Sequence, residues 1–260
     1  MELWDNPIGT DGFEFVEYTG PDPAALHRLF ESMGFRAVGK HRSKAVTLYR
    51  QGDTNFIVNA EPGSHGVRFA EKHGPSACAM AFRVKDAAAA YRELLARGAT
   101  PFANAVGPME LNIPAIQGIG GSVIYLVDRY GSHSIYDVDF VPTDPARGFT
   151  HDGAGLRNID HVTHNVFRGN MDLWAGFYEK LFNFREIRYF DIEGKLTGLK
   201  SRAMTSPDGN IRIPINESSD DKSQIEEYLH AYHGEGIQHI ALSTADIYTS
   251  VETLRSNGVS

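Results

Sequence analysis

The chain has 260 residues, of which 42% are hydrophobic, and its formal net charge is −8. This length suits one large domain or two small ones, and an acidic balance without Lys/Arg clusters predicts no nucleic acid as a partner. No apolar run is long enough to cross a membrane, and the single cysteine, Cys78, excludes an internal disulfide and suits a reducing cytoplasm.

Alternating hydrophobicity and turn residues predict one series of elements that occurs twice. Each half has a strand, a helix, further strands, a short helix, a strand and a helix. Residues 45–60 form two expected strands around the turn QGD, and residues 199–216 form two around SPDG. The glycine cluster QGIGG at 117–121 precedes an expected strand rather than a helix, so it is not a dinucleotide-binding fingerprint.

An alignment without gaps supports an internal duplication. HGPSACAMAFRVKDAAAAYRELLARGA, from residue 73, lies over HGEGIQHIALSTADIYTSVETLRSNGV, from residue 233. Asp86 and Asp246 match as helix N-caps, and Gly98 and Gly258 match at the helix ends. Two generic α+β units with similar helix ends are the alternative explanation.

A linker separates the two copies. The segment VPTDPARGFTHDGAG at 141–155 is rich in Pro, Gly and Asp, which places the domain boundary between residues 1–145 and 146–260. The first copy continues past Ala99 to about Phe140, whereas the second stops at Ser260, just after its helix. We therefore expect the second module to be incomplete at its C-terminal end.

Two histidines stand out in the second copy. Neighbouring residues of a strand point to opposite faces, so His161 shares a face with Ile159, Thr163 and Asn165, opposite His164. The same reasoning groups His239 with Ile237 and opposes both to Gln238. We expect His161 and His239 on one concave face, and His164, among valines, in the core or behind the site.

The first copy lacks both histidines. Phe15 aligns with His161, and Ala79 aligns with His239. Paired loss is expected of two ligands of one metal ion, and imidazole pairs suit Zn, Cu, Ni or Fe. The alternative is that each is a structural strand histidine.

Several segments resemble one family throughout the chain. MGFRAVGKHRSK, GPMELNIPAIQGIGG, IDHVTHNV, FYEKLFNFRE, RIPINE and GEGIQHIAL, in this order, resemble bacterial 4-hydroxyphenylpyruvate dioxygenase of the vicinal oxygen chelate superfamily. The resemblance implies an α+β fold of two tandem modules built from paired βαβββ units that form half-barrels, here with the second module truncated.

The resemblance also implies a metal and a reaction. Fe(II) would be held by two histidines, matched by His161 and His239, and by a glutamate beyond Ser260 that is absent from this chain. The α-keto acid of 4-hydroxyphenylpyruvate would chelate the iron, and reaction with O2 would give homogentisate and CO2 in tyrosine catabolism. Ser201, Asn216 and Gln238 match family positions that line the substrate site, although strand alternation directs Gln238 behind it. Ordinary strand polarity is the alternative for Ser201 and Asn216.

Other readings of the resemblance remain open. A 4-hydroxymandelate synthase would share the iron ligands and the substrate but hydroxylate the benzylic carbon. The chain is alternatively a non-catalytic fragment, because two histidines without the carboxylate would hold Fe(II) weakly. Family members are commonly dimers or tetramers, so a homodimer or homotetramer is expected.

Overall fold

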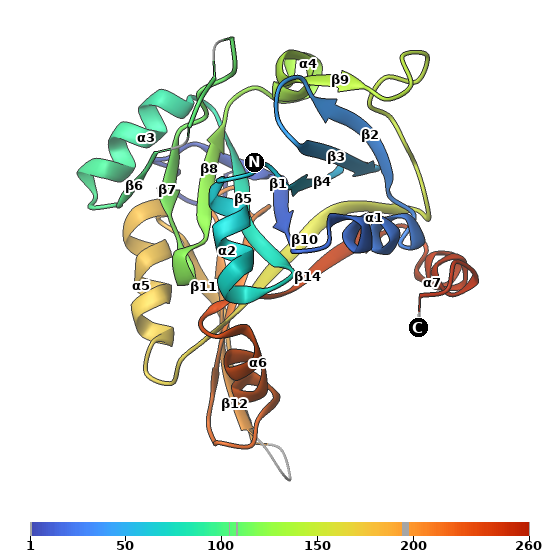
Figure 1. Ribbon diagram of the computed structural model, residues 1–260. Helices are drawn as coiled ribbons and strands as arrows, with labels where there is room; N and C mark the ends of the chain where they lie inside the picture. The colour runs from blue at the N-terminus through green and yellow to red at the C-terminus, as the bar shows by residue number, and fades with distance from the viewer. Residues whose placement is uncertain (1, 104, 108, 194–197, 260) are drawn as a thin grey trace.

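The strands of the chain form two separate sheets. The computed structural model describes residues 2–103, 105–107, 109–193 and 198–259, and Figure 1 shows how the chain passes from the first sheet to the second. The first sheet has nine strands in the order β6-β7-β8-β5-β1-β4-β3-β2-β9, and the second has five in the order β11-β12-β13-β10-β14. Neither sheet closes into a barrel in the part of the chain described.

The first module contains two βαβββ units and a terminal helix and strand. Its elements are β1 (Thr10–Thr19), α1 (Pro23–Ser32), β2 (Arg36–His41), β3 (Val46–Gln51), β4 (Thr54–Asn59), α2 (His65–His73), β5 (Ser76–Val84), α3 (Ala87–Ala96), β6 (Pro101–Phe102), β7 (Ala115–Gln117), the 3-10 turn η1 (Ile119–Gly121), β8 (Val123–Val127), the 3-10 turn η2 (Gly131–His133), α4 (Ile135–Asp139) and β9 (Phe140–Pro142). The segment 143–155, which contains the expected boundary, connects β9 to the second sheet.

The second module repeats the first unit and begins another. Its elements are β10 (Leu156–Val166), α5 (Met171–Phe182), β11 (Arg185–Glu193), β12 (Gly198–Thr205), β13 (Arg212–Ser218), α6 (Gln224–Tyr232), β14 (Gly236–Thr244) and α7 (Ile247–Ser256). The expected helix signals are present, because Asp86 caps α3 and Asp246 caps α7 through their carboxylates. Gly98 and Gly258 end these helices with φ of 97° and 90°.

The central ladders of the two modules match pair by pair. β1 is parallel to β4 and antiparallel to β5, just as β10 is parallel to β13 and antiparallel to β14. Phe15 lies opposite Ala81 in the first ladder, and His161 lies opposite Ala241 in the second. The register shifts also fall at matching positions. This agreement supports duplication of one module over convergence of two generic units.

The modules differ at the far edge of this ladder. In the first module, β5 also pairs in parallel with β8, with Ala79 opposite Val123. In the second module, β14 is the end of its sheet among the described residues. The fold is therefore α+β with two tandem modules, of which the second is truncated relative to the first.

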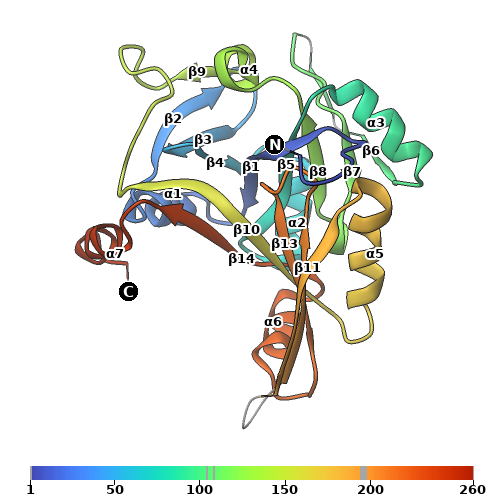
Figure 2. The ribbon, with the colours of Figure 1, turned by 180° about the vertical axis from the view of Figure 1, so that it is seen from behind.

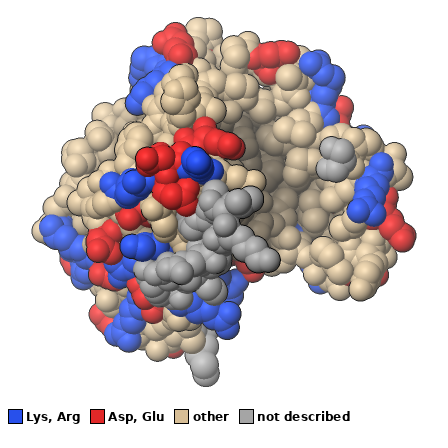
Figure 3. Space-filling model, turned by 90° about the horizontal axis from the view of Figure 1, so that it is seen from below, with Lys and Arg blue, Asp and Glu red and all other residues tan. Residues whose placement is uncertain are grey.

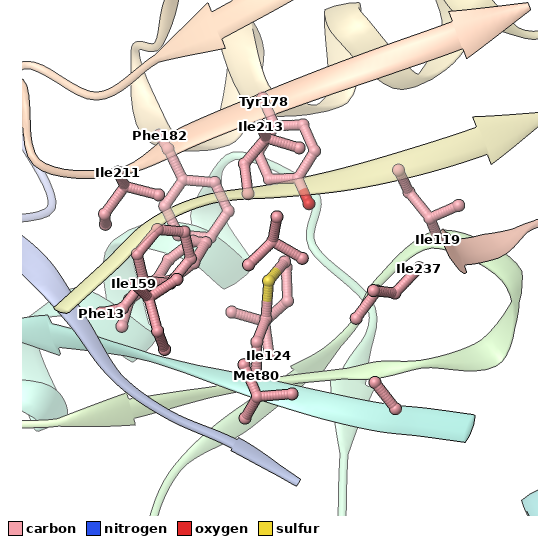
Figure 4. Close-up of a cluster of buried hydrophobic side chains, with 14 of the residues drawn as sticks. Phe13, Met80, Ile119, Ile124, Ile159, Tyr178, Phe182, Ile211, Ile213 and Ile237 are labelled. Carbon is pink, nitrogen blue, oxygen red and sulfur yellow. The ribbon is translucent and has the colours of Figure 1, made fainter. Parts of the chain in front are cut away.

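One hydrophobic core joins the two modules. Figure 4 shows Phe13, Met80 and Ile124 of the first module facing Ile159, Phe182 and Ile213 of the second. The ring of Phe82 lies edge-on to Phe182, with centroids 5.4 Å apart. A second buried cluster, which includes Phe15, Ile57, Ala79 and Tyr125, belongs to the first module alone. Because strand neighbours point to opposite faces, the sheet of the first module lies between these two clusters.

The helices lie on the outside of this arrangement. In the two opposite views of Figures 1 and 2, α3 of the first module and α5 of the second lie side by side, whereas α7 projects at the end of β14. Acidic and basic side chains are interspersed on the face seen from below (Figure 3). On β12, Arg202 pairs with Asp172, Glu179 and Glu186.

Candidate metal centre

His161 and His239 lie on neighbouring strands and face each other. In the ladder between β10 and β14, Thr163 is opposite His239 and His161 is opposite Ala241, so the two histidines are diagonal neighbours on one face. Their ring centroids are 5.5 Å apart and their planes are inclined by 78°. Imidazoles at this separation can share one ion, because metal–nitrogen bonds are about 2 Å long.

The Nδ1 atom of each histidine contacts the side chain of the preceding residue. His161 Nδ1 is 2.8 Å from Asp160 Oδ2, and Asp160 Oδ1 accepts a hydrogen bond from Arg212. His239 Nδ1 contacts Gln238 Oε1. A proton held on Nδ1 leaves the lone pair of Nε2 for a metal, which is how ligand histidines are commonly oriented.

The hydroxyl group of Thr163 contacts Nε2, the second ring nitrogen of His239. The two atoms are 3.0 Å apart. A metal ion at His239 would therefore displace this contact, and the hydroxyl would turn toward another acceptor. Thr163 is buried, with 1% of its surface exposed, so the ring of His239 packs against a fixed neighbour.

Strict alternation does not hold along these strands. The ladder shifts register three times, between Leu156 and Ile159, between Ile159 and His161, and between Thr163 and His164. Ile159 and Ile237, which alternation places beside the histidines, are instead buried in the shared core. An irregular ladder re-aims side chains, so Gln238 reaches His239 although alternation directs it away.

His164 is separate from the other two histidines. It is fully buried, and burial lowers its pKa to about 3. It therefore stays neutral over the physiological range and packs as a core residue, as its valine neighbours indicated.

The electrostatic environment of His239 favours its neutral form. Burial lowers its pKa, and the nearby His161 lowers it further. A histidine must be neutral to bind a metal, so the lowered pKa leaves His239 able to bind a cation at neutral pH.

Ser201 and Asn216 form a polar row with Asn165. Ser201 on β12 is the cross-strand partner of Asn216 on β13, which in turn lies beside Asn165 on β10. The Asn216 amide donates a long, 3.4 Å hydrogen bond to Asn165 Oδ1. Asn165, like Asp160 and Thr163, was not predicted as a site residue. Its place on the His161 face was the signal available for it.

The residues present fit two positions of a metal site. Among the described residues, no group of three or more His, Cys, Asp or Glu side chains is arranged to hold an ion. The matching positions of the first module, Phe15 and Ala79, carry no metal donor. A facial arrangement of two histidines and a carboxylate would therefore need a third donor from outside the described residues.

Comparison with known proteins identifies the family of the chain. Residues 4–141 match the family model of the N-terminal part of hydroxyphenylpyruvate dioxygenase, and residues 158–260 match that of the glyoxalase, bleomycin resistance protein and dioxygenase superfamily. A 4-hydroxyphenylpyruvate dioxygenase of Pseudomonas aeruginosa is 62% identical over 98% of this chain and 72% of its own. Hemolysin VllY of Vibrio vulnificus is 64% identical with the same coverage.

The chain belongs to the 4-hydroxyphenylpyruvate dioxygenase family. It is thus a dioxygenase-family protein of the vicinal oxygen chelate superfamily. A triple mutant of 4-hydroxymandelate synthase from Streptomyces coelicolor has the same fold, with a TM-score of 0.83 at 23% identity over 96% of this chain and 76% of the other. None of the described helices has the length and apolar character needed to cross a membrane.

Proposed function

We propose that the chain carries the two histidine ligands of an Fe(II)-dependent dioxygenase that converts 4-hydroxyphenylpyruvate and O2 to homogentisate and CO2. The observation that carries this proposal is the pairing of His161 and His239, 5.5 Å apart on one sheet face, in a module whose duplicate lacks both. Bound Fe(II) would supply the redox chemistry with O2, while the protein orients the substrate.

Each neighbouring side chain has a task in this proposal. Asp160 and Gln238 hold the Nδ1 atoms of the two histidines, which would leave the Nε2 atom of each ring as the metal donor once the Thr163 hydroxyl is displaced from His239. Ser201 and Asn216 offer a hydroxyl and an amide for the polar groups of the substrate. Gln238 thus supports the ligand His239, rather than contacting the substrate.

The first module indicates where a third ligand would enter. Its strand β8 runs parallel to β5, beside Ala79. The matching residue on β14 is His239, and the edge of β14 has no strand on that side among the described residues. A further strand paired with β14 as β8 pairs with β5 would pass beside His239, where a carboxylate on it would complete the site.

A completed chain tests this function. We would extend the chain with the C-terminal part of the Pseudomonas aeruginosa relative, load it with Fe(II) without oxygen, and measure O2 uptake on adding 4-hydroxyphenylpyruvate. Uptake should appear in the extended chain and be absent from its His239→Ala variant. An extended chain that binds Fe(II) but leaves 4-hydroxyphenylpyruvate unchanged would refute the proposal.

The product distinguishes the proposed activity from its nearest alternative. Homogentisate is expected, whereas 4-hydroxymandelate would assign the chain to the sister reaction. Without the extension, the 260-residue chain should show no uptake, because two histidines hold Fe(II) weakly. Uptake by the unextended chain would contradict the need for an outside carboxylate.

The same proposal has a cellular setting. We propose that the enzyme acts in tyrosine catabolism in the cytoplasm. A reducing compartment suits the chain, because its single cysteine, Cys78, is free and buried. We further propose a homodimer or homotetramer for the complete enzyme, which analytical ultracentrifugation would test.

A further inference from the structure

The first module contains an open-sided cavity of about 300 Å³ that has no part in the proposed reaction. Its walls include Phe15, Val46, Ile57 and Tyr125, which belong to strands β1, β3, β4 and β8. Three of these side chains belong to the buried cluster of the first module, on the sheet face opposite the shared core. Four strands of one sheet therefore supply this part of the cavity wall.

The cavity stands where the second module has its candidate metal centre. Phe15 matches His161 in the two ladders, and Glu17, which lies opposite Ala79, matches Thr163, which lies opposite His239. The first module thus has a cavity at the positions that match the candidate metal centre, and there it carries a carboxyl group, Glu17, and no histidine.

Glu17 directs this carboxyl group into the cavity. Its side chain lines the cavity although only 7% of the residue is exposed. Oε1 accepts a hydrogen bond from Asn59 at 2.8 Å and contacts Cys78 Sγ at 3.6 Å. No hydrogen bond among the described residues reaches Oε2. Since buried polar groups are usually paired, Oε2 is an open position for a ligand.

Apart from the exposed Arg68, the cationic and imidazole side chains that line the cavity favour a neutral ligand over an ion. The Lys44 ammonium is already paired with Glu110 at 2.7 Å. Burial lowers the pKa of His41 and His65, which line the same cavity, so both are neutral at pH 7. Burial also raises the pKa of Glu17. A hydroxyl suits this carboxyl group in either protonation state, because it both donates and accepts hydrogen bonds.

We propose that this cavity binds a small single-ring phenol, with the ring against Phe15 and Ile57 and the hydroxyl on Glu17 Oε2. The volume is at the lower end of the range for ligand pockets, which limits the ligand to about one ring. The aromatic and aliphatic walls bind the ring, and the single open carboxyl oxygen selects the hydroxyl. This site is separate from His161 and His239, so it does not depend on the proposed dioxygenase activity.

Binding of 4-methylphenol, with toluene as the probe without a hydroxyl, tests this site in the full chain. Titration calorimetry should show 4-methylphenol binding more tightly than toluene. Glu17→Leu should weaken 4-methylphenol about tenfold and leave toluene unchanged, because it removes one buried hydrogen bond. Glu17→Gln, which keeps a hydrogen-bonding group, should stay within about threefold of the parent chain.

Two further variants locate the ligand. Val46→Phe narrows the cavity and should abolish binding of both probes, which keeps the test decisive if Glu17→Leu fails to fold. His239→Ala in the other module should leave 4-methylphenol binding unchanged. Equal affinity for toluene and 4-methylphenol, no binding at millimolar concentration, or a loss in His239→Ala rather than in the Glu17 and Val46 variants would each overturn the proposal.

Discussion

His161 and His164 on β10 and His239 on β14 differ in the surroundings of their rings. His161 and His239 have polar neighbours at Nδ1, and His161 is half-buried and His239 exposed, whereas His164 is fully buried in the core. The same residue type therefore serves two purposes along one strand. Polar neighbours fix a ring and keep a lone pair available, whereas burial keeps a ring neutral.

The burial of His164 makes the protein less stable in mild acid. Its pKa is about 3 in the folded chain and about 6.5 when unfolded, so the unfolded state binds more protons between these values. Stability therefore falls as pH drops below 6.5, by about 2 kcal/mol between pH 7 and pH 5 from this residue. Urea denaturation of the chain and of His164→Leu at both pH values should show this difference. Equal pH dependence in the two proteins would contradict it, since the other histidines are common to both.

Asp160 is expected to act through His161. Asp160→Ala removes the acceptor at Nδ1, so the proton of the ring should redistribute between its two nitrogens. Long-range 1H–15N NMR reads this tautomer directly, and Fe(II) affinity should fall about 10–100-fold. Asp221→Ala, which removes a surface partner of Arg168, is the control and should change neither. An unchanged tautomer in Asp160→Ala would rule out this role.

At the scale of elements, ladder irregularities decide which side chains meet. Alternation along 156–166 and 236–244 correctly brought His161 and His239 to one face, because both lie between the register shifts. It failed for Ile159, Ile237 and Gln238, which lie at or beyond a shift. An extra residue in a strand leaves no mark in a hydrophobic pattern, so its position was not predictable from the sequence.

The duplication was the most informative sequence signal. It predicted the order of elements, the helix caps at Asp86 and Asp246, and the match of Phe15 with His161. The carboxyl group of Glu17 and its cavity were not predicted, because they depend on side chains from four strands meeting in space. A third donor for the proposed metal site is not found among the described residues.

The glycine cluster before β8 has a packing reason rather than a nucleotide-binding one. Gly120 has φ of 65°, and a Cβ there would lie 1.9 Å from the carbonyl oxygen of Glu235 in the second module. Gly120→Ala should therefore cost about 2–4 kcal/mol of stability. Gly121 also has a positive φ, but a Cβ there would meet nothing within 4 Å, so Gly121→Ala should cost less stability than Gly120→Ala. Thermal unfolding of both variants tests this, and equal losses would show that contact with Glu235 is unimportant.

At the scale of the molecule, the shared core makes the two modules one folding unit. Phe82 of the first module is fully buried and packs against Phe182 and Phe184 of the second. Side chains of the first module therefore bury part of the hydrophobic core of the second. This packing also stabilises the sheet that positions His161 and His239.

Truncation of Phe82 should destabilise both modules together. Phe82→Ala is expected to cost about 3–5 kcal/mol. In a Trp4→Phe background, the fluorescence of Trp174 reports on the second module and should show the same lowered transition as far-ultraviolet circular dichroism of the whole chain. Leu95→Ala, on the exposed side of α3, is the control and should change little. Two separate transitions, with only the first shifted, would show that the modules unfold independently.

The pairing of His161 and His239 as ligands of one ion is tested most directly by anaerobic titration of the chain with Fe(II). One weak site is expected, lost in both His161→Ala and His239→Ala and kept in the control His230→Ala, which alters an exposed histidine of α6. Loss of the site in both variants would establish the two residues as joint ligands. Fe(II) binding that survives either substitution unchanged would contradict the proposed metal centre.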